Sequence, residues 1–501
     1  MATVLATPGV YIEEKSAFAS SVVPVATAVP VFLGYTQKSA RGSKSLKNVP
    51  TKISSFAEFS QFFGSAPKVK FSINEDDSAV TGYNLQVDTA TRFILHSAVK
   101  FFYSNGGGDC YILSVGDYSK GVSAKDFNDE ETGAGIPQLL KYNEPTLMVI
   151  PEAILLPSAE CFSLQQAMLN HCGYATKNRF AILDVHDGDK DRTYDESDVI
   201  NQFREGIGAN FLQWGAAYYP FVQTTIVSSG DVNFTNINNK TDLIEILSKD
   251  VNNDLESGAM NEARGNAIKE ELAKIEIATT EEEISSLQST LKVVCPKLNS
   301  VLTEMAELLN LLPASSGMAG IYAMVDSSIN VAKAPANLSL GSVIRPSVQI
   351  TNKTQEELNV PLNGKAINAI RTFQGKGVLV WGARTLDGNS QDWRYISVRR
   401  TMTFLEQSIK AAAEGYVFEP NSSTTWSTLK ATVTNFLLNQ WQSGILAGQS
   451  PDDAFSVSIG LGTTMTPNDI LDGILKLSVK VAISRPAEFI VITFEQQQQK
   501  S

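Results

Sequence analysis

Residues 377–420 read GVLVWGARTLDGNSQDWRYISVRRTMTFLEQSIKAAAEGYVFEP, and the rest of the chain is organised around this stretch. It begins with a short apolar run at residues 378–381, continues with a polar turn and ends with a long amphipathic segment. That order predicts a strand, a turn and a helix within a compact α/β core. Nothing in the stretch indicates catalysis.

The amphipathic segment is apolar on one face at spacings of three and four, which predicts a helix with one buried side. The apolar positions are Tyr395, Val398, Met402, Leu405, Ile409 and Ala412. The same periodicity places Arg399, Arg400, Glu406 and Lys410 on the solvent side. Glu406 and Lys410 also stand four residues apart in the order that favours a helical ion pair.

Composition limits the possible functions. A chain of 501 residues is too long for one ordinary core, so we expect roughly two to four domains or one core with large insertions. The formal charge of −12, from 53 acidic and 41 basic residues, argues against nucleic-acid binding. Four scattered cysteines and three histidines favour buried thiols over a zinc site, and we expect no cofactor. The sequence contains no secretory signal and no long apolar run, so we expect no direct membrane insertion.

The middle of the chain contains a β-α-β pattern. Apolar residues 146–151 and 179–185 flank the helical residues 164–172, which predicts a buried parallel pair of strands. The second strand leads into DVHDGDKD, where Asp184, His186, Asp187 and Asp189 could form a metal or acid/base cluster. The alternative is a turn, because Asp and Gly are typical turn residues and no second cluster is paired with this one.

Residues 241–312 are charged and carry apolar stripes at alternating spacings of three and four, which predicts a helical insertion. Pro296 interrupts the pattern and is expected at the first position of a new helix. Local packing of short helices and a dimerising coiled coil, which would make the chain an adaptor, both fit the stripes. Residues 72–89, acidic around Glu75, Asp76 and Asp77, predict a surface loop.

Both ends of the chain favour extended structure. The N-terminal residues 1–25 include the β-prone Val10, Tyr11 and Ile12, and they fit an arm or a frayed tail. The C-terminal run AEFIVITFE at residues 487–495 is strongly β-forming. Its apolar residues are Phe489, Ile490, Val491, Ile492 and Phe494. An unpaired strand of this kind promotes aggregation, so we expect a defined partner, either within the chain or on a neighbouring subunit.

Several phrases in order resemble one protein family, the contractile sheath proteins of bacteriophage tails and related contractile injection systems. They are TPGVYIEEKS, PVATAVPVFLGYT, AGIYAMVDSSINVAKAPAN, INAIRTFQGKGVLVWGARTL, WRYISVRRTMTFLEQSI, FEPN, NFLLNQWQSGIL and RPAEFIVITF. The likeness is patchy in the first third of the chain and almost continuous over residues 317–495. The helical residues 241–312 look more like the sheaths of extracellular, phage-tail-like injection particles than like those of phages.

The resemblance implies a structural protein rather than an enzyme. It implies subunits in hexameric rings, stacked as a helical sheath around an inner tube, that contract to drive the tube through a target cell envelope. The partners would be the inner tube protein, baseplate and terminator or cap proteins, and paralogous sheath subunits. The particle would be assembled in the bacterial cytoplasm. Both terminal arms, at residues 7–14 and 488–495, would add strands to neighbouring subunits.

The expected fold class is a multi-domain α/β (α+β) protein. We expect an N-terminal arm at residues 1–25, a middle and outer region at 26–360, a C-terminal sheath core at 361–484 and a C-terminal β arm at 485–501. The basic residues Arg371, Lys376, Arg384, Arg394, Arg399 and Arg400 stand out in an acidic chain. Arg394, Arg399 and Arg400 are our candidates for contacts with the tube or a neighbour, with intramolecular pairing as the alternative. A metal-dependent α/β enzyme and a coiled-coil adaptor are the competing functions.

Overall fold

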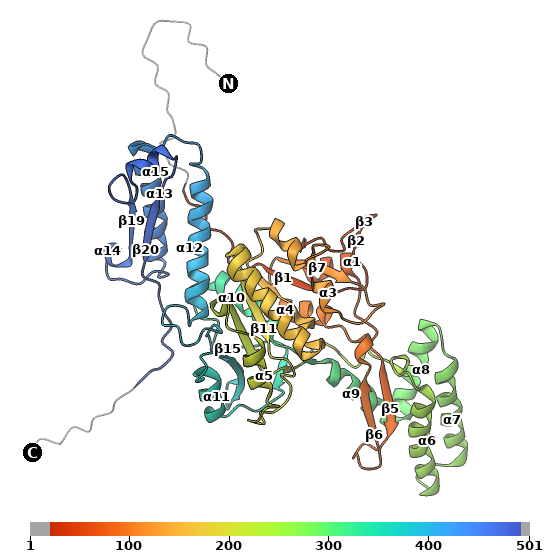
Figure 1. Cartoon of the computed structure of the whole chain (residues 1–501). Helices are drawn as coiled ribbons and strands as arrows, with labels where there is room; N and C mark the ends of the chain where they lie inside the picture. Colours follow the sequence, from red (N-terminus) through yellow and green to blue (C-terminus); the bar gives the residue numbers. More distant parts are fainter. Residues whose placement is uncertain (1–20, 492–501) are drawn as a thin grey trace, which may run out of the picture. The chain divides into compact units, whose positions relative to one another are not determined.

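The computed structural model of the chain describes residues 21–491, which form two compact units (Figure 1). The sheet unit comprises Ala26–Arg400 and the described residues from Arg485 onward. The hairpin unit comprises Thr401–Ser484 and the described residues up to Val25. The expected α/β multi-domain class is confirmed.

A nine-stranded sheet forms the centre of the sheet unit, with strand order β15-β18-β17-β12-β11-β10-β1-β7-β4. Its strands are β1 (Pro30–Tyr35), β4 (Thr51–Ile53), β7 (Cys110–Gly116), β10 (Leu147–Val149), β11 (Phe180–Asp184), β12 (Gly215–Tyr219), β15 (Leu338–Ser339), β17 (Asn368–Phe373) and β18 (Gly377–Trp381). The strands from β17 to β7 in this order are parallel, whereas β15, β18 and β4 pair antiparallel at the two edges. Pro30 begins β1, where its missing N–H removes no ladder bond from the strand interior.

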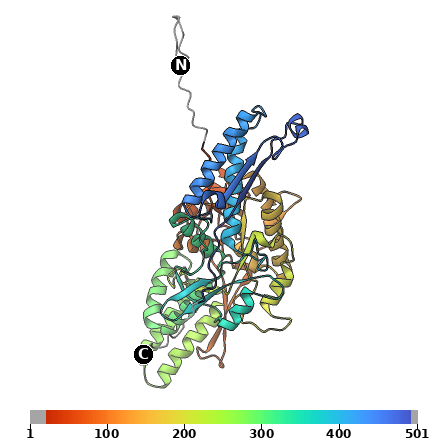
Figure 2. The same cartoon turned by 90° about the vertical axis from the view of Figure 1, so that its left-hand side faces the viewer.

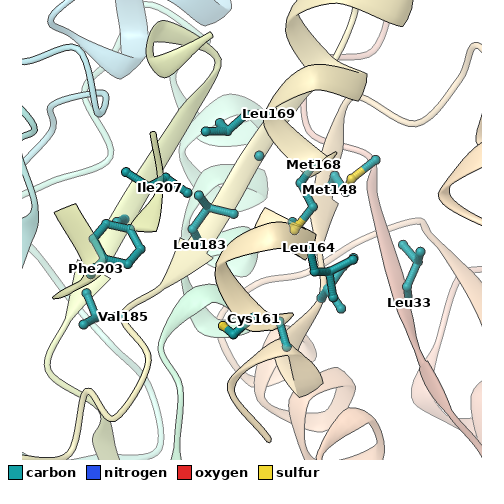
Figure 3. Close-up of a cluster of buried hydrophobic side chains, with 14 of the residues drawn as sticks. Leu33, Met148, Cys161, Leu164, Met168, Leu169, Leu183, Val185, Phe203 and Ile207 are labelled. Atoms are coloured by element: carbon teal, nitrogen blue, oxygen red, sulfur yellow. The ribbon is translucent and has the colours of Figure 1, made fainter. Parts of the chain in front are cut away.

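Helices cover both faces of this sheet, as expected for buried parallel strands. Helices α2 (Leu95–Ser104) and α10 (Ser315–Ser328) pack on the face that carries Phe32. Helices α4 (Ser158–Asn170) and α5 (Val199–Gly206) pack on the face that carries Leu33. Figure 3 shows the second face, where Leu164 and Met168 of α4 lie near Met148 and Leu33 of the sheet. The predicted β-α-β unit is therefore confirmed as β10-α4-β11.

Buried carboxylates cap two of these helices from a distance. The N-cap residues of α2 and α10 are Ile94 and Ala314, whose side chains accept no hydrogen bond. Glu152 instead accepts the N–H groups of Ile94 and Leu95 at 2.9 and 3.0 Å, and that of Tyr35 at 2.8 Å. Asp184 accepts the N–H of Ser315 at 2.9 Å. Burial raises the pKa of each of these carboxyls to about 7, although the N–H donors oppose the shift.

Smaller elements surround the nine-stranded sheet. They are β2 (Ala40–Arg41), β3 (Lys44–Ser45), α1 (Phe56–Phe63), α3 (Ala124–Phe127), β8 (Asn128–Asp129), β9 (Ala134–Gly135), β13 (Val222–Thr224), β14 (Leu311–Leu312), β16 (Val343–Pro346) and α11 (Asn352–Asn359). Strands β14, β13 and β16 form a three-stranded sheet. The helix α2 ends just before Gly106, whose φ of +86° is a left-handed conformation that favours glycine after a helix C-terminus.

The helical insertion consists of α6 (Lys240–Glu256), α7 (Glu262–Ile277), α8 (Glu281–Val294) and α9 (Pro296–Leu309), drawn in green in Figures 1 and 2. Pro296 is the first residue of α9, as predicted. The apolar stripes meet one another and the hairpin of β5 (Phe71–Glu75) and β6 (Tyr83–Val87) in one buried cluster. Their apolar faces are thus buried within the chain. This is the local packing of short helices, and it leaves no apolar stripe within residues 240–309 for a dimerising coiled coil.

The expectation of a surface loop at residues 72–89 is wrong. The segment forms the β5–β6 hairpin, whose residues Phe71, Ile73, Tyr83 and Leu85 are buried against the insertion. Alternate residues of a strand point to opposite faces, so the hairpin buries one side although Glu75, Asp76 and Asp77 give its tip an acidic character.

The hairpin unit contains the part of α12 (Ile396–Glu414) from Thr401 onward, α13 (Ser423–Gln442), α14 (Pro451–Ala454) and α15 (Pro467–Leu471). Its strands β19 (Phe455–Ile459) and β20 (Leu477–Val481) form a two-stranded antiparallel sheet. Strand β20 exposes Ser478 and Lys480 between half-buried apolar residues. None of the helices described in residues 21–491 is long and apolar enough to cross a membrane.

Candidate assembly site

The C-terminal segment of the sheet unit is bound to the folded body through the side chain of Glu488, and the residues after Glu488 are exposed. The guanidinium of Arg384 donates to both Glu488 carboxylate oxygens, from Nε at 2.9 and 3.2 Å and from Nη2 at 2.7 Å. Asn359 Nδ2 donates to the same carboxylate at 2.7 Å, and the Tyr395 hydroxyl does so at 3.0 Å. The next three residues, 489–491, are 71%, 79% and 89% exposed.

This cluster favours a charged Glu488. Burial alone would raise the pKa of its carboxyl, but the hydrogen bonds from Arg384 and Asn359 and the charge of Arg384 outweigh burial and hold that pKa below its usual value. The Arg384 side chain is almost fully buried, and it also donates from Nη1 to the carbonyl oxygens of Asn359 and Gly388. Charged, bidentate hydrogen bonds of this kind are among the stronger polar contacts in proteins.

The expectation that Arg399 and Arg400 face solvent is wrong, because both side chains lie in the buried first turn of α12. The guanidinium of Arg399 stacks between two indole rings, 4.2 Å from the ring centroid of Trp214 and 4.3 Å from that of Trp393. Arg400 donates to Asp326 and lies 4.8 Å from the ring centroid of Tyr322. Glu406 and Lys410, further along the helix, are exposed as predicted.

Other members of the basic set are also bound within the sheet unit. Arg371 donates to Gln355 at 2.7 Å, and its guanidinium lies 4.9 Å from the Phe373 ring centroid. Arg394 is half-buried and donates from Nε to the carbonyl oxygen of Ser390 at 2.9 Å. Intramolecular pairing is therefore found for most of these residues.

The hairpin unit offers free sheet edges. Strands β19 and β20 pair along their whole length, from Phe455 with Val481 to Ile459 with Leu477. No third strand joins this sheet within residues 21–491. Each of its two strands therefore presents backbone N–H and C=O groups on one edge to which a further strand could add.

Comparison with known proteins supports the resemblance to contractile sheath proteins, both in sequence and in fold. Residues 389–497 match the phage tail sheath C-terminal domain. The chain is 26% identical to a subunit in the cryo-EM structure of an extracellular contractile injection system, the PVC sheath complex in the contracted state. That match has a TM-score of 0.61 and covers 99% of both chains. The chain is thus similar to contractile sheath proteins over its whole length, and residues 389–497 match the family's C-terminal domain.

A second sheath structure and a curated phage protein extend the comparison. The helical sheath of the anti-feeding prophage in the contracted state is 26% identical to this chain, with a TM-score of 0.60 over 99% of this chain and 100% of the other. The tail sheath protein of Vibrio phage KVP40 is 24% identical over 187 residues, which make up 36% of this chain and only 26% of the phage protein. The chain therefore matches about a quarter of its curated phage relative.

Side chains at the end of β11 and in the loop after it are bound to other groups of the fold. Asp184 caps α10, and His186 Nε2 lies 2.9 Å from the carbonyl oxygen of Leu156. Asp187 pairs with Lys190 at 2.7 Å. Among residues 21–491 no group of three or more His, Cys, Asp or Glu side chains is arranged to hold a metal ion. The metal-dependent enzyme thus receives no support from the geometry.

Only part of the predicted arms can be placed. Val10, Tyr11, Ile12, Ile492 and Phe494 lie outside the described residues. Phe489, Ile490 and Val491 lie outside every strand and are exposed, so the described part of the C-terminal arm has no strand partner within residues 21–491. The sequence reasoning missed Glu488 and its partner Arg384; the available signal was a single acid at the start of an apolar β-forming run.

Proposed function

We propose that this chain polymerises as stacked hexameric rings around an inner tube and contracts to drive the tube through a target cell envelope. The observation that carries the proposal is the likeness, over 99% of both chains, to a subunit of a contracted sheath complex. That likeness includes the helical insertion, which supports an extracellular injection particle rather than a phage tail.

The terminal arms supply the connections between subunits in this proposal. Residues 7–14 and 488–495 add as strands to neighbouring copies, and the free edges of the β19–β20 sheet are suitable acceptors. Each backbone hydrogen bond contributes about 0.5–1.5 kcal/mol net, so several bonds per arm, repeated along the lattice, hold the subunits together. Extended arms can bend while the folded units move as bodies.

Contraction is a mechanical step that needs no nucleotide in this scheme. The extended lattice is metastable, and contraction releases free energy as contacts form between subunit bodies. The partners are further copies of this chain, an inner tube protein, a baseplate, terminator or cap proteins and paralogous sheath subunits. The particle is assembled in the bacterial cytoplasm. Arg394 remains our candidate for a contact with the tube or a neighbour, since it is the least buried of the three arginines first considered.

Negative-stain electron microscopy of the purified full-length protein tests the proposal. We expect long hollow cylinders with a helical surface. Removal of residues 1–14 or of residues 487–501 is expected to leave folded subunits that do not polymerise. Ordered cylinders from both truncations would contradict the role of the arms, and a full-length protein that stays monomeric at every concentration and salt condition would contradict the sheath function.

A further inference from the structure

We propose that Glu488 and Arg384 form a latch that fixes the point at which the C-terminal arm leaves the subunit body. The proposal rests on the proposed function of the arm, and it assigns positioning residues to that arm. The latch lies entirely within the sheet unit, because Arg384 follows β18 and Glu488 belongs to the described residues after Arg485.

The contacts of the C-terminal segment change abruptly at Glu488. Its carboxylate receives hydrogen bonds from Arg384, Asn359 and Tyr395. The following residue, Phe489, is 71% exposed, and the exposed fraction increases along the next two residues. The arm is therefore held on one side of the Glu488–Phe489 bond and accessible on the other.

The latch depends on charge as well as shape. Arg384 is 3% exposed, and Glu488 is the only carboxylate paired with it among the described residues. Its guanidinium also donates to the carbonyl oxygens of Asn359 and Gly388, which cannot neutralise its charge. Release of Glu488 leaves a buried arginine without a counter-charge, so the attached state is strongly favoured.

The position of the latch sets the reach of the arm. The preceding anchor is Arg485, which donates to the carbonyl oxygen of Gln391 at 2.6 Å and is half exposed. If Glu488 is released, three more residues become free, which lengthens the arm by about 10 Å. A longer and less fixed arm samples several registers on an acceptor edge, and a slip of one residue turns the apolar side chains to the wrong face. The latch therefore contributes to correct strand register between subunits.

The test compares polymerisation of Glu488→Gln, Glu488→Asp and the exposed control Glu414→Gln with that of the wild-type chain. Glu488→Gln keeps the shape of the side chain and removes its charge, Glu488→Asp keeps the charge, and Glu414→Gln removes the same charge elsewhere. The measurements are the subunit concentration at which sheaths first form, the melting temperature of the monomer and hydrogen exchange of residues 486–491.

We expect Glu488→Gln to need about tenfold more subunit to form sheaths. Its monomer is expected to melt within a few degrees of the wild type, because Glu488 is 20% exposed and lies on a terminal segment whose release admits water to Arg384. Exchange at residues 486–491 is expected to be faster. Glu488→Asp is expected to lie closer to the wild type, and Glu414→Gln to match it. Polymerisation of Glu488→Gln at the wild-type concentration would overturn the latch, and so would a loss of monomer stability that accounts for the whole defect. Deletion of residues 487–501 separates the two proposals. Normal assembly of the truncated chain would contradict the arm function itself. Lost assembly of the truncated chain together with normal assembly of Glu488→Gln would contradict only the latch.

Discussion

Substitution of Asp326 by Asn is expected to destabilise the sheet unit by about 3–5 kcal/mol. The Asp326 and Arg400 side chains are 5% and 4% exposed, and Arg400 donates to Oδ1 at 3.0 Å. Asn keeps the shape of the side chain but not its charge. The amide oxygen of Asn can still accept a hydrogen bond, but no opposite charge then faces the guanidinium. Its other contacts, with the carbonyl oxygen of Thr27 at 2.9 Å and the ring of Tyr322, carry no net negative charge. A buried guanidinium without a carboxylate accounts for the magnitude, because desolvation is no longer offset by an opposite charge.

The assay is urea unfolding of the monomeric subunit, followed by tryptophan fluorescence. Glu271→Gln provides the matched control, because it removes the same charge from a pair with Lys274 whose side chains are 32% and 51% exposed. An exposed pair of this kind contributes less than about 1 kcal/mol. Losses of similar, small size in both variants would refute the reasoning that burial makes the Asp326–Arg400 pair important.

Three further predictions concern stability. Burial raises the pKa of Glu152 to about 7, above the usual carboxyl value. Its protonated form therefore stabilises the fold fully below about pH 4.5, and this contribution is lost as the pH rises through 7. Glu152→Gln should remove this pH dependence, on the order of 3 kcal/mol, from the free energy of unfolding measured across that range. Gly135→Ala should destabilise by well over the roughly 1 kcal/mol of Gly258→Ala. Both glycines have a φ of +73°, but only a Cβ at Gly135 would clash with a backbone oxygen, that of Phe127; equal melting temperatures would contradict this. In helix α7, the buried Leu272 and the 73% exposed Ile277 form a matched pair for denaturant unfolding. Leu272→Ala should lower the free energy of unfolding by about 2–5 kcal/mol and Ile277→Ala by less than about 0.5 kcal/mol. Both variants should still form sheaths.

The sequence predicted the elements whose signal is local. The continuous apolar runs of β10 and β11 and the helix between them require only neighbouring residues, and so does the start of α9 at Pro296. For these elements the pattern along the chain and the packing in the fold agree, because each buries the face that its periodicity defines.

The sequence did not predict features that depend on distant partners. Helical periodicity assigns Arg399 and Arg400 to the solvent side, but their partners Trp214 and Asp326 are far away in the chain. No local pattern reports such a pair. The β5–β6 hairpin was missed for a related reason, since its acidic tip dominates the composition while its buried face packs on helices more than 150 residues later. The helix α11 was missed because its residues are almost all polar and only Leu358 is buried.

Buried charged groups and exposed apolar residues lie in different parts of the subunit. Arg384, Arg400, Glu152 and Asp184 are all buried and all have partners within the sheet unit, so these four groups need no neighbour. Residues 489–491 are the opposite case: they are apolar, β-forming and exposed. Full burial of such side chains contributes about 1.5–3 kcal/mol each, or several kcal/mol for the three together. That free energy is obtained only when another surface covers them, so the arm beyond Glu488 favours association while the body before it is stable without it.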